Sequence, residues 1–317
     1  MLDSTVKHDA PDRTGPTARA LRRVARQEDL NFLLTNRIPR IALTRLMGRI
    51  SRIDSPALTR FSLALWRLFT DLDLTEAKPA RWRSLHQVFT RELVAGARPV
   101  DADPRVLVSP CDAIVGACGQ AERDLLLQAK GLRYSMRELF GPSQDPAPFE
   151  GGAYATLRLT SAMYHRFHAP ADGRLAHVTY LSGDTWNVNP IALARIERLF
   201  CRNERAVLRL VLDDGLPLAL VPVAAVLVAS IRLHALDVRL HLRWPGPNEM
   251  PCDAAVARGQ ELGWFEHGST ILVFAPPGCT LAPGIGPGAR IRMGQALMRR
   301  PASPGARPSS SRHRAAG

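Results

Sequence analysis

The chain has 317 residues, 46% of them hydrophobic, and a formal net charge of +13 from 42 basic and 29 acidic side chains. This length allows one large domain or two ordinary ones, and the composition is that of a globular protein that can bury a core. The positive charge favours an anionic partner, either nucleic acid or anionic lipid. Five cysteines without a C-x-x-C pair argue against a disulfide framework and against a zinc site, and a reducing compartment is the simpler reading.

The N-terminal part of the chain is expected to be helical. Residues 1 to about 17 are polar and charged, which predicts a disordered lead-in and shows no secretory signal. Residues 18–95 are predicted to form a helical region. Within it, Ser55 and Pro56 make a plausible helix start. The apolar residues that follow recur at helical spacing: Leu58, Phe61, Leu65 and Leu68.

A basic amphipathic stretch precedes this helix. In "LTNRIPRIALTRLMGRISRI", isoleucine, leucine and methionine alternate with five arginines and no acidic residue. Segments of this kind commonly lie on a membrane surface. The alternative is an ordinary packed helix with a solvated arginine face, and the composition alone leaves both open.

Strand-like segments dominate from about residue 96 to residue 300. "VLVSPCDAIVGAC", "GAYATLRLT", "GRLAHVTYL" and "RAVLRLVL" are short, rich in β-formers and bounded by turn residues. "GDTWNVNPIALARIERLFCRNE" interrupts them with a predicted loop and short helix. Helices followed by strands predict an α+β protein. Residues 301–317, rich in Pro, Ser, Arg and Gly, are predicted to be a disordered basic tail.

The longest apolar run is "LALVPVAAVLVASI", residues 218–231. It contains Pro222 and is shorter than the roughly 20 residues that a membrane-spanning helix needs. We therefore expect one or two buried strands here and no crossing of a membrane.

Three short motifs carry residues that could do chemistry. "VSPCDA" contains Asp112, "YHRFHAPADG" contains His165 and His168, and "HGST" places Ser269 directly before a predicted strand. An acid, an imidazole and a hydroxyl are the groups that activate a weak nucleophile. Each motif also has a plain structural reading, as a capped turn, a packed histidine pair or a Gly-Ser turn. No third ligand with metal-like spacing accompanies the histidines, so we expect no metal.

Three other functional classes each lack a feature that they would need. A serine hydrolase using Ser269 would need G-x-S-x-G between a strand and a helix, whereas Ser269 is followed by a predicted strand. A lipoyl or biotin carrier, suggested by "PGIGPGARIRMGQALM", would need a lysine at a hairpin tip, and no lysine follows Lys130. A basic nucleic-acid-binding protein is suggested by charge alone, without a zinc finger, helix-turn-helix or aromatic strand motif.

The chain resembles the bacterial phosphatidylserine decarboxylase proenzymes over roughly residues 80 to 295. The resemblance is carried, in the same order along the chain, by "FTRELVAGARPVD", "VLVSPCDAIV", "LLLQAKGLRYSM", "YHRFHAPADGRL", "GDTWNVNP", "LFCRNERAVL", "VAAVLVASI" and "RGQELGWFEHGSTILVFAP". Two positions depart from the family pattern. His267 stands where the family usually has leucine, and Cys111-Asp112-Ala113 replaces Ala-Asp-Gly.

The resemblance implies a mainly antiparallel β catalytic domain that cleaves itself between Gly268 and Ser269. The Ser269 hydroxyl attacks the Gly268 carbonyl, and the resulting ester is resolved by β-elimination. The dehydroalanine that remains hydrolyses to a pyruvoyl group and ammonia. The resemblance assigns His168 as the base and Asp112 as the carboxylate that orients it.

The same resemblance implies the reaction and its partners. The cofactor is the covalent pyruvoyl group from Ser269, without metal or pyridoxal phosphate, and it accepts the electrons left when carbon dioxide departs. His165 is the candidate acid that reprotonates the carbanion left by decarboxylation, and the product is phosphatidylethanolamine. The large chain (1–268) and small chain (269–317) are expected to stay associated on the cytoplasmic face of the bacterial cell membrane. Phosphatidylserine in an anionic leaflet is the expected partner, and the helical region of residues 18–95 is expected to be membrane-associating. No nucleic acid is expected, and a homodimer is one arrangement open to the enzyme.

Overall fold

The computed structural model describes residues 36–227, 230–242, 244–266 and 269–301, together with residues 29, 32 and 33. The predicted lead-in (1–17) and all of the predicted tail except Pro301 lie outside the described residues. His267 and Gly268 lie outside them as well. The division into domains therefore stays a prediction.

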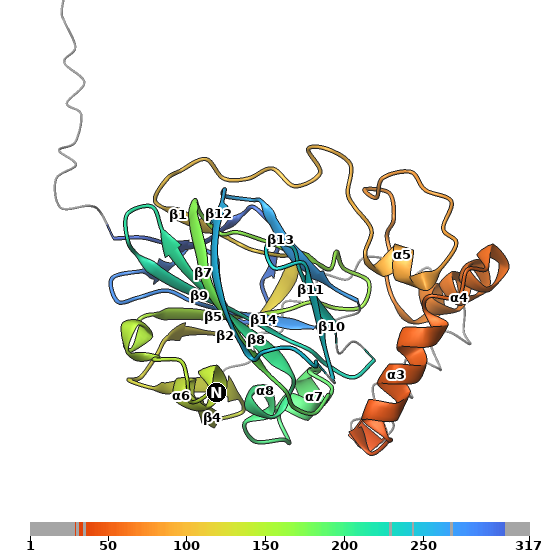
Figure 1. Ribbon diagram of the computed structural model, residues 1–317, viewed down its shortest axis with the longest axis horizontal. Coiled ribbons are helices and arrows are strands. Elements are labelled where there is room, and N and C mark those ends of the chain that lie inside the picture. Colours follow the sequence, from red (N-terminus) through yellow and green to blue (C-terminus); the bar gives the residue numbers. More distant parts are fainter. Residues whose placement is uncertain are drawn as a thin grey trace, which may run out of the picture.

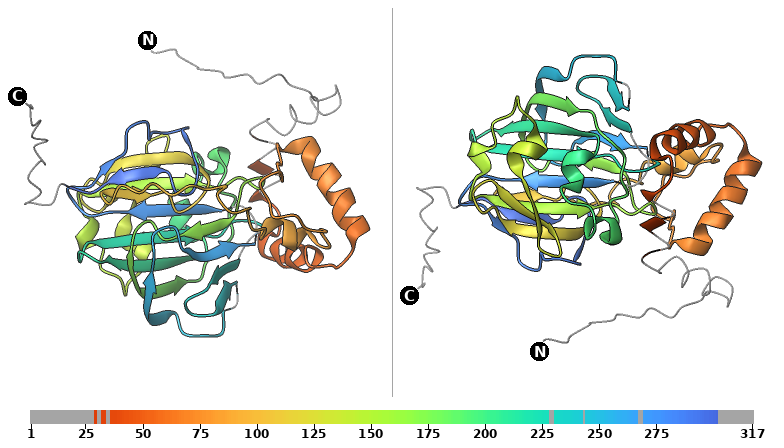
Figure 2. Two further views of the ribbon diagram at one scale, coloured as in Figure 1. Left: turned by 90° about the horizontal axis from the view of Figure 1, so that it is seen from above. Right: turned by 90° about the horizontal axis from the view of Figure 1, so that it is seen from below.

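Three helices of the N-terminal part gather at one end of a β-rich body (Figure 1 and Figure 2). They are α3 (Arg40–Ile50), α4 (Pro56–Phe69) and α5 (Leu85–Phe89). The predicted start of α4 is confirmed, because the Ser55 hydroxyl accepts a hydrogen bond from the Leu58 amide and Pro56 occupies the first helical position. In the part of the chain that the structure describes, no helix combines the length and hydrophobicity needed to span a bilayer.

The apolar stripe of α4 is largely exposed. Leu58, Phe61, Leu65 and Leu68 are 36%, 69%, 48% and 45% exposed, respectively. The opposite side of the helix contributes Leu63 to a small core with Leu72 and Val88. The helix predicted from this spacing is confirmed, but the apolar residues that define the spacing are exposed rather than buried in a core.

The body is built on an antiparallel sheet of eight strands in the order β12-β7-β8-β9-β14-β5-β2-β16. Its buried positions are filled by leucine and alanine together with β-branched and aromatic residues, and the latter two kinds pack well on a pleated surface. The strands are β2 (Ala113–Gln120), β5 (Ala153–Arg158), β7 (Gly173–Leu181), β8 (Arg205–Leu212), β9 (Pro217–Val223), β12 (Glu249–Val256), β14 (Thr270–Phe274) and β16 (Arg290–Ile291).

Smaller sheets and short helices surround this sheet. A four-stranded sheet runs in the order β11-β10-β13-β6, a three-stranded one in the order β1-β17-β15, and β3 and β4 form a hairpin. The strands are β1 (Val106–Val108), β3 (Leu125–Ala129), β4 (Leu132–Ser135), β6 (Arg166–His168), β10 (Ser230–Leu233), β11 (Val238–His241), β13 (Glu261–Phe265), β15 (Thr280–Leu281) and β17 (Ala296–Arg299). The short helices are α6 (Met136–Phe140), η1 (Ala147–Phe149), α7 (Pro190–Leu193) and α8 (Leu199–Arg202).

The predicted α+β class is confirmed, and so is the interpretation of the long apolar run. Residues 218–223 lie in β9 and residues 230–231 in β10, and no described residue of this run is helical. The interrupting segment forms a loop and two one-turn helices, α7 and α8.

The way the sheets pair fixes both ends of the loop of residues 159–165. Strand β14 begins opposite the last residue of β5, and β13 ends where β6 begins. The loop therefore starts beside Ser269, at the entry to β14, and finishes beside the last residue of β13. Hydrogen bonds close both ends, from the Leu159 amide to the Ser269 carbonyl (2.8 Å) and from the Phe265 amide to the His165 carbonyl (3.0 Å).

The close approach of β10 to β13 depends on Gly263. Strand β13 ends beside the loop of residues 159–165. A Cβ at Gly263 would lie 1.8 Å from the Arg232 carbonyl oxygen, whereas a Cβ at Gly116, also in a strand, would meet only ordinary contacts at 3.5 Å. We expect Gly263→Ala to destabilise the protein by roughly 3 kcal/mol because backbone atoms must shift. Gly116→Ala, the matched control, should change stability by less than about 1 kcal/mol. Thermal unfolding of the two variants measures the difference, and equal melting temperatures would contradict the steric argument.

Candidate active site

Ser269 is fully buried at the entry to β14. Its strand lies between β9 and β5 in the middle of the large sheet, so its backbone is held on both sides. The Ser269 hydroxyl makes no hydrogen bond to any described residue. A buried hydroxyl without a partner costs about 1–3 kcal/mol. Such a group calls for a reason, and a nucleophile is one.

His165 lies in the neighbouring loop and is also fully buried. Its ring packs edge-on against Phe89 of α5, with 5.8 Å between centroids, and Phe89 in turn lies 4.5 Å from Trp66 of α4. The Trp66 indole N–H donates to the Ser161 hydroxyl at 3.4 Å. The N-terminal helices therefore cover the loop that carries His165.

His168 ends β6 and is 5% exposed. Burial lowers the pKa of His168 to about 4, against the opposing effect of the Glu261 carboxylate, so the ring is neutral near pH 7. The Tyr164 hydroxyl lies 3.5 Å from His168 Nε2. Two residues of extended chain lie between the histidines, and an offset of three positions places their side chains on opposite faces. The contacts agree with this placement, because the His165 ring packs against Phe89, whereas His168 lies next to Tyr164.

Asp112 is held by an arginine rather than by a histidine. Arg98 donates from Nε to Oδ1 at 2.8 Å and from Nη2 to Oδ2 at 2.5 Å, and the Met293 amide also donates to Oδ1, at 2.9 Å. No hydrogen bond joins Asp112 to His168, although both residues are described. The Asp112 charge still raises the pKa of His168 slightly, which places the two groups in the same electrostatic environment. Direct orientation of the imidazole by Asp112 remains a prediction.

Arg98 and Tyr164 are the two site residues that sequence reasoning did not single out. Arg98 links Asp112 to Glu76, with Nη1 2.8 Å from the Glu76 carboxylate. Burial raises the pKa of Tyr164 well above its ordinary value, so its hydroxyl stays protonated. Both residues lie within segments that carried the family resemblance, "FTRELVAGARPVD" and "YHRFHAPADGRL". The resemblance of these two segments to the family is the sequence feature that could have pointed to both residues.

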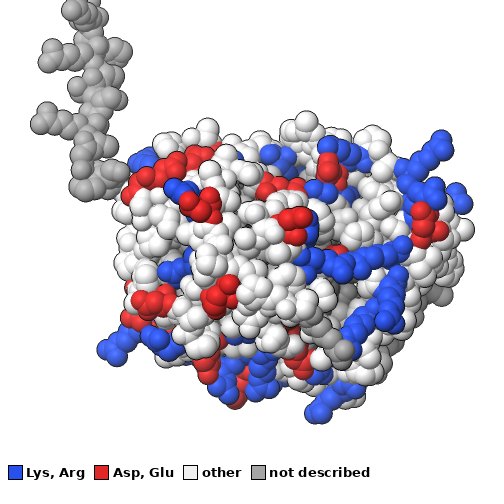
Figure 3. All heavy atoms as spheres, in the orientation of Figure 1, with Lys and Arg blue, Asp and Glu red and all other residues white. Residues whose placement is uncertain are grey.

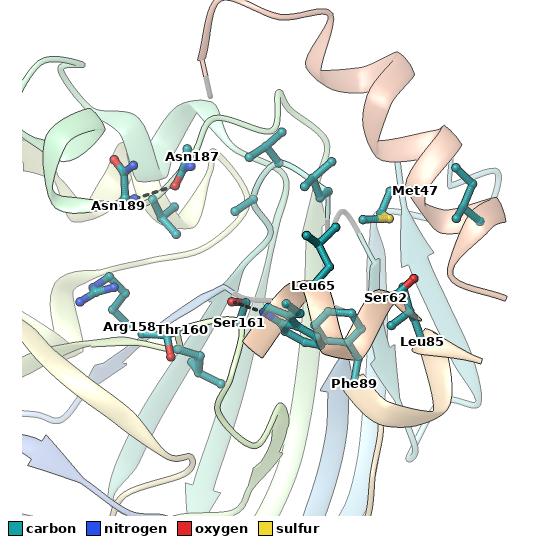
Figure 4. A pocket seen from close by; sticks show the side chains of 17 residues that line it. Met47, Ser62, Leu65, Leu85, Phe89, Arg158, Thr160, Ser161, Asn187 and Asn189 are labelled. Atoms are coloured by element: carbon teal, nitrogen blue, oxygen red, sulfur yellow. Dashed lines mark hydrogen bonds between the residues drawn. The ribbon is translucent and has the colours of Figure 1, made fainter. Parts of the chain in front are cut away.

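An apolar cavity of about 680 Å³ lies between the N-terminal helices and the loop next to Ser269. In Figure 4, Met47, Leu65 and Phe89 come from the helices, while Thr160, Ser161, Asn187 and Asn189 come from loops of the β body. The lining residues are Met47, Ile50, Ser62, Leu65, Trp66, Leu85, Phe89, Arg158, Leu159, Thr160, Ser161, Asn187, Val188, Asn189, Ala225, Val226 and Leu227.

A second, polar cavity of about 470 Å³ lies beside the same loop. Asp112, Arg98 and Tyr164 line it, and Thr160 lines both cavities. The loop thus separates an apolar space from a charged one. Among the described residues, no group of three or more His, Cys, Asp or Glu side chains could hold a metal ion.

The comparisons with known proteins agree with this arrangement. The sequence profile of the family described as "Phosphatidylserine decarboxylase" matches residues 85–299. A protein of Halorhodospira halophila named phosphatidylserine decarboxylase proenzyme is 40% identical over 277 residues, covering 83% of this chain and 91% of that protein. Proteins of the same name from Shewanella baltica and Shewanella sp. are 35% and 34% identical over 282 residues, covering 85% of this chain and 96% of each relative.

The family match spans both histidines, Asp112 and Ser269, and the relatives align over most of their own length. The two findings are independent of the geometry described above and lead to one conclusion. The chain belongs to the phosphatidylserine decarboxylase family and is a carboxy-lyase.

Proposed function

We propose that this chain converts phosphatidylserine to phosphatidylethanolamine and carbon dioxide by means of a pyruvoyl group made from its own Ser269. The observation that carries the proposal is the buried, unpartnered hydroxyl of Ser269 at the start of the central strand. A pyruvoyl group there would supply a carbonyl that binds the substrate amine and accepts the electron pair released with carbon dioxide. Ser269 is fully buried, and shielding from water strengthens the electrostatic interactions that such electron withdrawal needs.

Formation of that group requires the Ser269 hydroxyl to lose its proton while it attacks the Gly268 carbonyl. His168 is our candidate base, because its lowered pKa keeps the ring neutral and able to accept a proton. The Arg98–Asp112 pair and the Tyr164 hydroxyl lie on the His168 side of the loop, where they would hold the ring in place. His165, on the other side, is our candidate acid for returning a proton to the carbon that lost carbon dioxide.

The two cavities suit the two ends of the substrate. The apolar cavity would take the first part of an acyl chain, since eleven of its seventeen lining side chains are hydrophobic. The loop that separates the cavities would hold the serine headgroup near Ser269. We place the enzyme on the cytoplasmic face of the membrane, where the exposed stripe of α4 would enter the lipid.

The two chains produced by cleavage would stay together because the small chain supplies strands to several sheets. Strand β14 pairs with both β5 and β9, β16 pairs with β2, and β17 pairs with β1. Separation would break all these ladders and expose fully buried residues. We therefore propose a stable noncovalent pair of chains, 1–268 and 269–317.

The first test is cleavage itself. The purified protein should give two fragments on a denaturing gel, the smaller beginning at Ser269, without a free amino terminus and reactive toward carbonyl reagents. Ser269→Ala should give one band and no carbon dioxide, because no hydroxyl is available to attack. Carbon dioxide release from a single-band wild-type protein would contradict the proposal.

The second test separates the histidines. His168→Ala should remain uncleaved and inactive, because Ser269 lacks its base. His165→Ala should cleave but release carbon dioxide about 10²- to 10⁴-fold more slowly. Asp112→Asn should resemble His168→Ala.

Gel bands and carbon dioxide release score the two steps of this second test independently. If His165→Ala blocks cleavage while His168→Ala permits it, the two roles are reversed. Normal cleavage in both variants would point to another base, with His267 as the first suspect.

The third test concerns the exposed stripe of α4. Replacing Leu58 and Phe61 with Ser should weaken binding to anionic vesicles and slow turnover of vesicle substrate, while cleavage proceeds. Ala57→Ser with Ala64→Ser is the matched control, because these small residues are exposed on the same helix. Vesicle and RNA cosedimentation should be run in parallel, since RNA binding without vesicle binding would favour the nucleic-acid alternative.

A further inference from the structure

A basic cavity of about 330 Å³ lies on the side of α3 away from the apolar cavity. Four arginines line it, two from α3 and one each from the segment after α3 and from β11. The lining residues are Thr44, Arg45, Gly48, Arg49, Arg52, Ser230, Arg239, His241, Leu242 and Glu266.

The charges in this basic cavity are not balanced. Glu266 is its one acidic lining residue, and both Glu266 oxygens accept from Arg52 at 2.6 Å, with Arg239 at 3.6 Å. Arg45 and Arg49 are exposed and form no ion pair with any described carboxylate. Four guanidinium groups thus face one carboxylate, which leaves an excess of three positive charges.

Ser230 gives the basic cavity a buried polar group as well. The residue is 5% exposed, and its hydroxyl makes no hydrogen bond to a described residue. Its carbonyl accepts from the Glu266 amide at 3.4 Å, so the backbone around it is fixed. A buried hydroxyl beside arginines that lack carboxylates is a donor ready for an anion.

Helix α3 separates this cavity from the candidate active site. Met47 and Ile50 line the apolar cavity, whereas Arg45 and Arg49 line the basic one. The Thr44 hydroxyl accepts from the Leu227 amide at 2.9 Å, which fixes the helix between the two spaces. An anion in the basic cavity would therefore not lie in the space next to Ser269.

We propose that the basic cavity is a phosphate-binding site that holds the phosphate group of an anionic phospholipid, apart from the reacting molecule. Guanidinium groups match phosphate oxygens in paired, charge-assisted hydrogen bonds. Exposed Leu46 on α3 and Ile53 just after it provide apolar surface beside the cavity for the lipid tails. Figure 3 shows Lys and Arg side chains gathered on the side occupied by the N-terminal helices. This site goes beyond the decarboxylation and does not depend on it.

The test is binding of the full-length protein to phosphatidylcholine vesicles with and without phosphatidic acid. Arg45→Gln with Arg49→Gln removes two charges from the basic cavity. Arg60→Gln with Arg67→Gln removes two exposed charges from α4, outside the cavity, and is the matched control. We expect the cavity pair to weaken binding about 10-fold more than the control pair, because it loses specific hydrogen bonds as well as charge.

Ser230→Ala tests the site without changing charge. It removes an unpartnered hydroxyl, so the fold should be unharmed, and it should weaken binding about fivefold if that hydroxyl donates to phosphate. Equal losses of binding in the two arginine pairs, together with wild-type binding by Ser230→Ala, would show that the arginines act only through the net charge of the surface. That result would overturn the proposal.

Inorganic phosphate distinguishes the source of the phosphate group. At constant ionic strength, a lipid site should bind free phosphate weakly, and millimolar phosphate should shift the melting temperature little. A large shift that Ser230→Ala abolishes, without any cavity-dependent vesicle binding, would assign the site to a soluble phosphate ester instead. All these readouts are binding measurements, so they stand or fall independently of cleavage and carbon dioxide release.

Discussion

The arrangement of the site depends on the pairing of β14 with two neighbours at once. A strand in the middle of an antiparallel sheet has every backbone group engaged, so its first residue is positioned by two ladders. Ser269 sits directly before that strand, and its carbonyl is held by the loop of residues 159–165. Ser269, the proposed nucleophile, is therefore held by strand pairing next to its own position. The loop that carries His165 begins beside it, since the Leu159 amide donates to the Ser269 carbonyl.

The N-terminal helices complete the site rather than forming a separate appendage. They cover the His165 loop through Phe89 and Trp66, and they form one wall of the apolar cavity. The arginines of the α3 segment divide into two groups. Arg40 donates to Asp184 and stacks on Trp186, and Arg52 binds Glu266, so these two hold the helices to the body. Arg45 and Arg49 form no ion pair with a described carboxylate. The packed-helix interpretation of this stretch therefore fits Arg40 and Arg52, whereas contact with a membrane surface stays a proposal for Arg45 and Arg49.

Much of the fold could be predicted because its elements follow local rules. Strands such as β8 and β14 are runs of β-branched and apolar residues, and Ser55 with Pro56 marks the start of α4. Strand β6 has only three residues, too few for a periodic pattern, so the histidine motif looked like a turn. The Asp112–Arg98 pair could not be predicted either, because Arg98 lies in an irregular segment whose path is set by tertiary contacts. The exposure of the α4 stripe could not be predicted either, because it depends on which face of the helix packs against the rest of the protein.

The central position of β14 has a consequence for the molecularity of folding. Before cleavage, the chain folds in a first-order process, since every strand belongs to one molecule. After cleavage at Gly268, the same sheet would be shared by two molecules, and unfolding would release the small chain into solution. Refolding would then be second order and slow at low concentration, and the melting temperature would depend on protein concentration. Durability of the mature enzyme would rest on a high barrier to opening the sheet rather than on reversible stability.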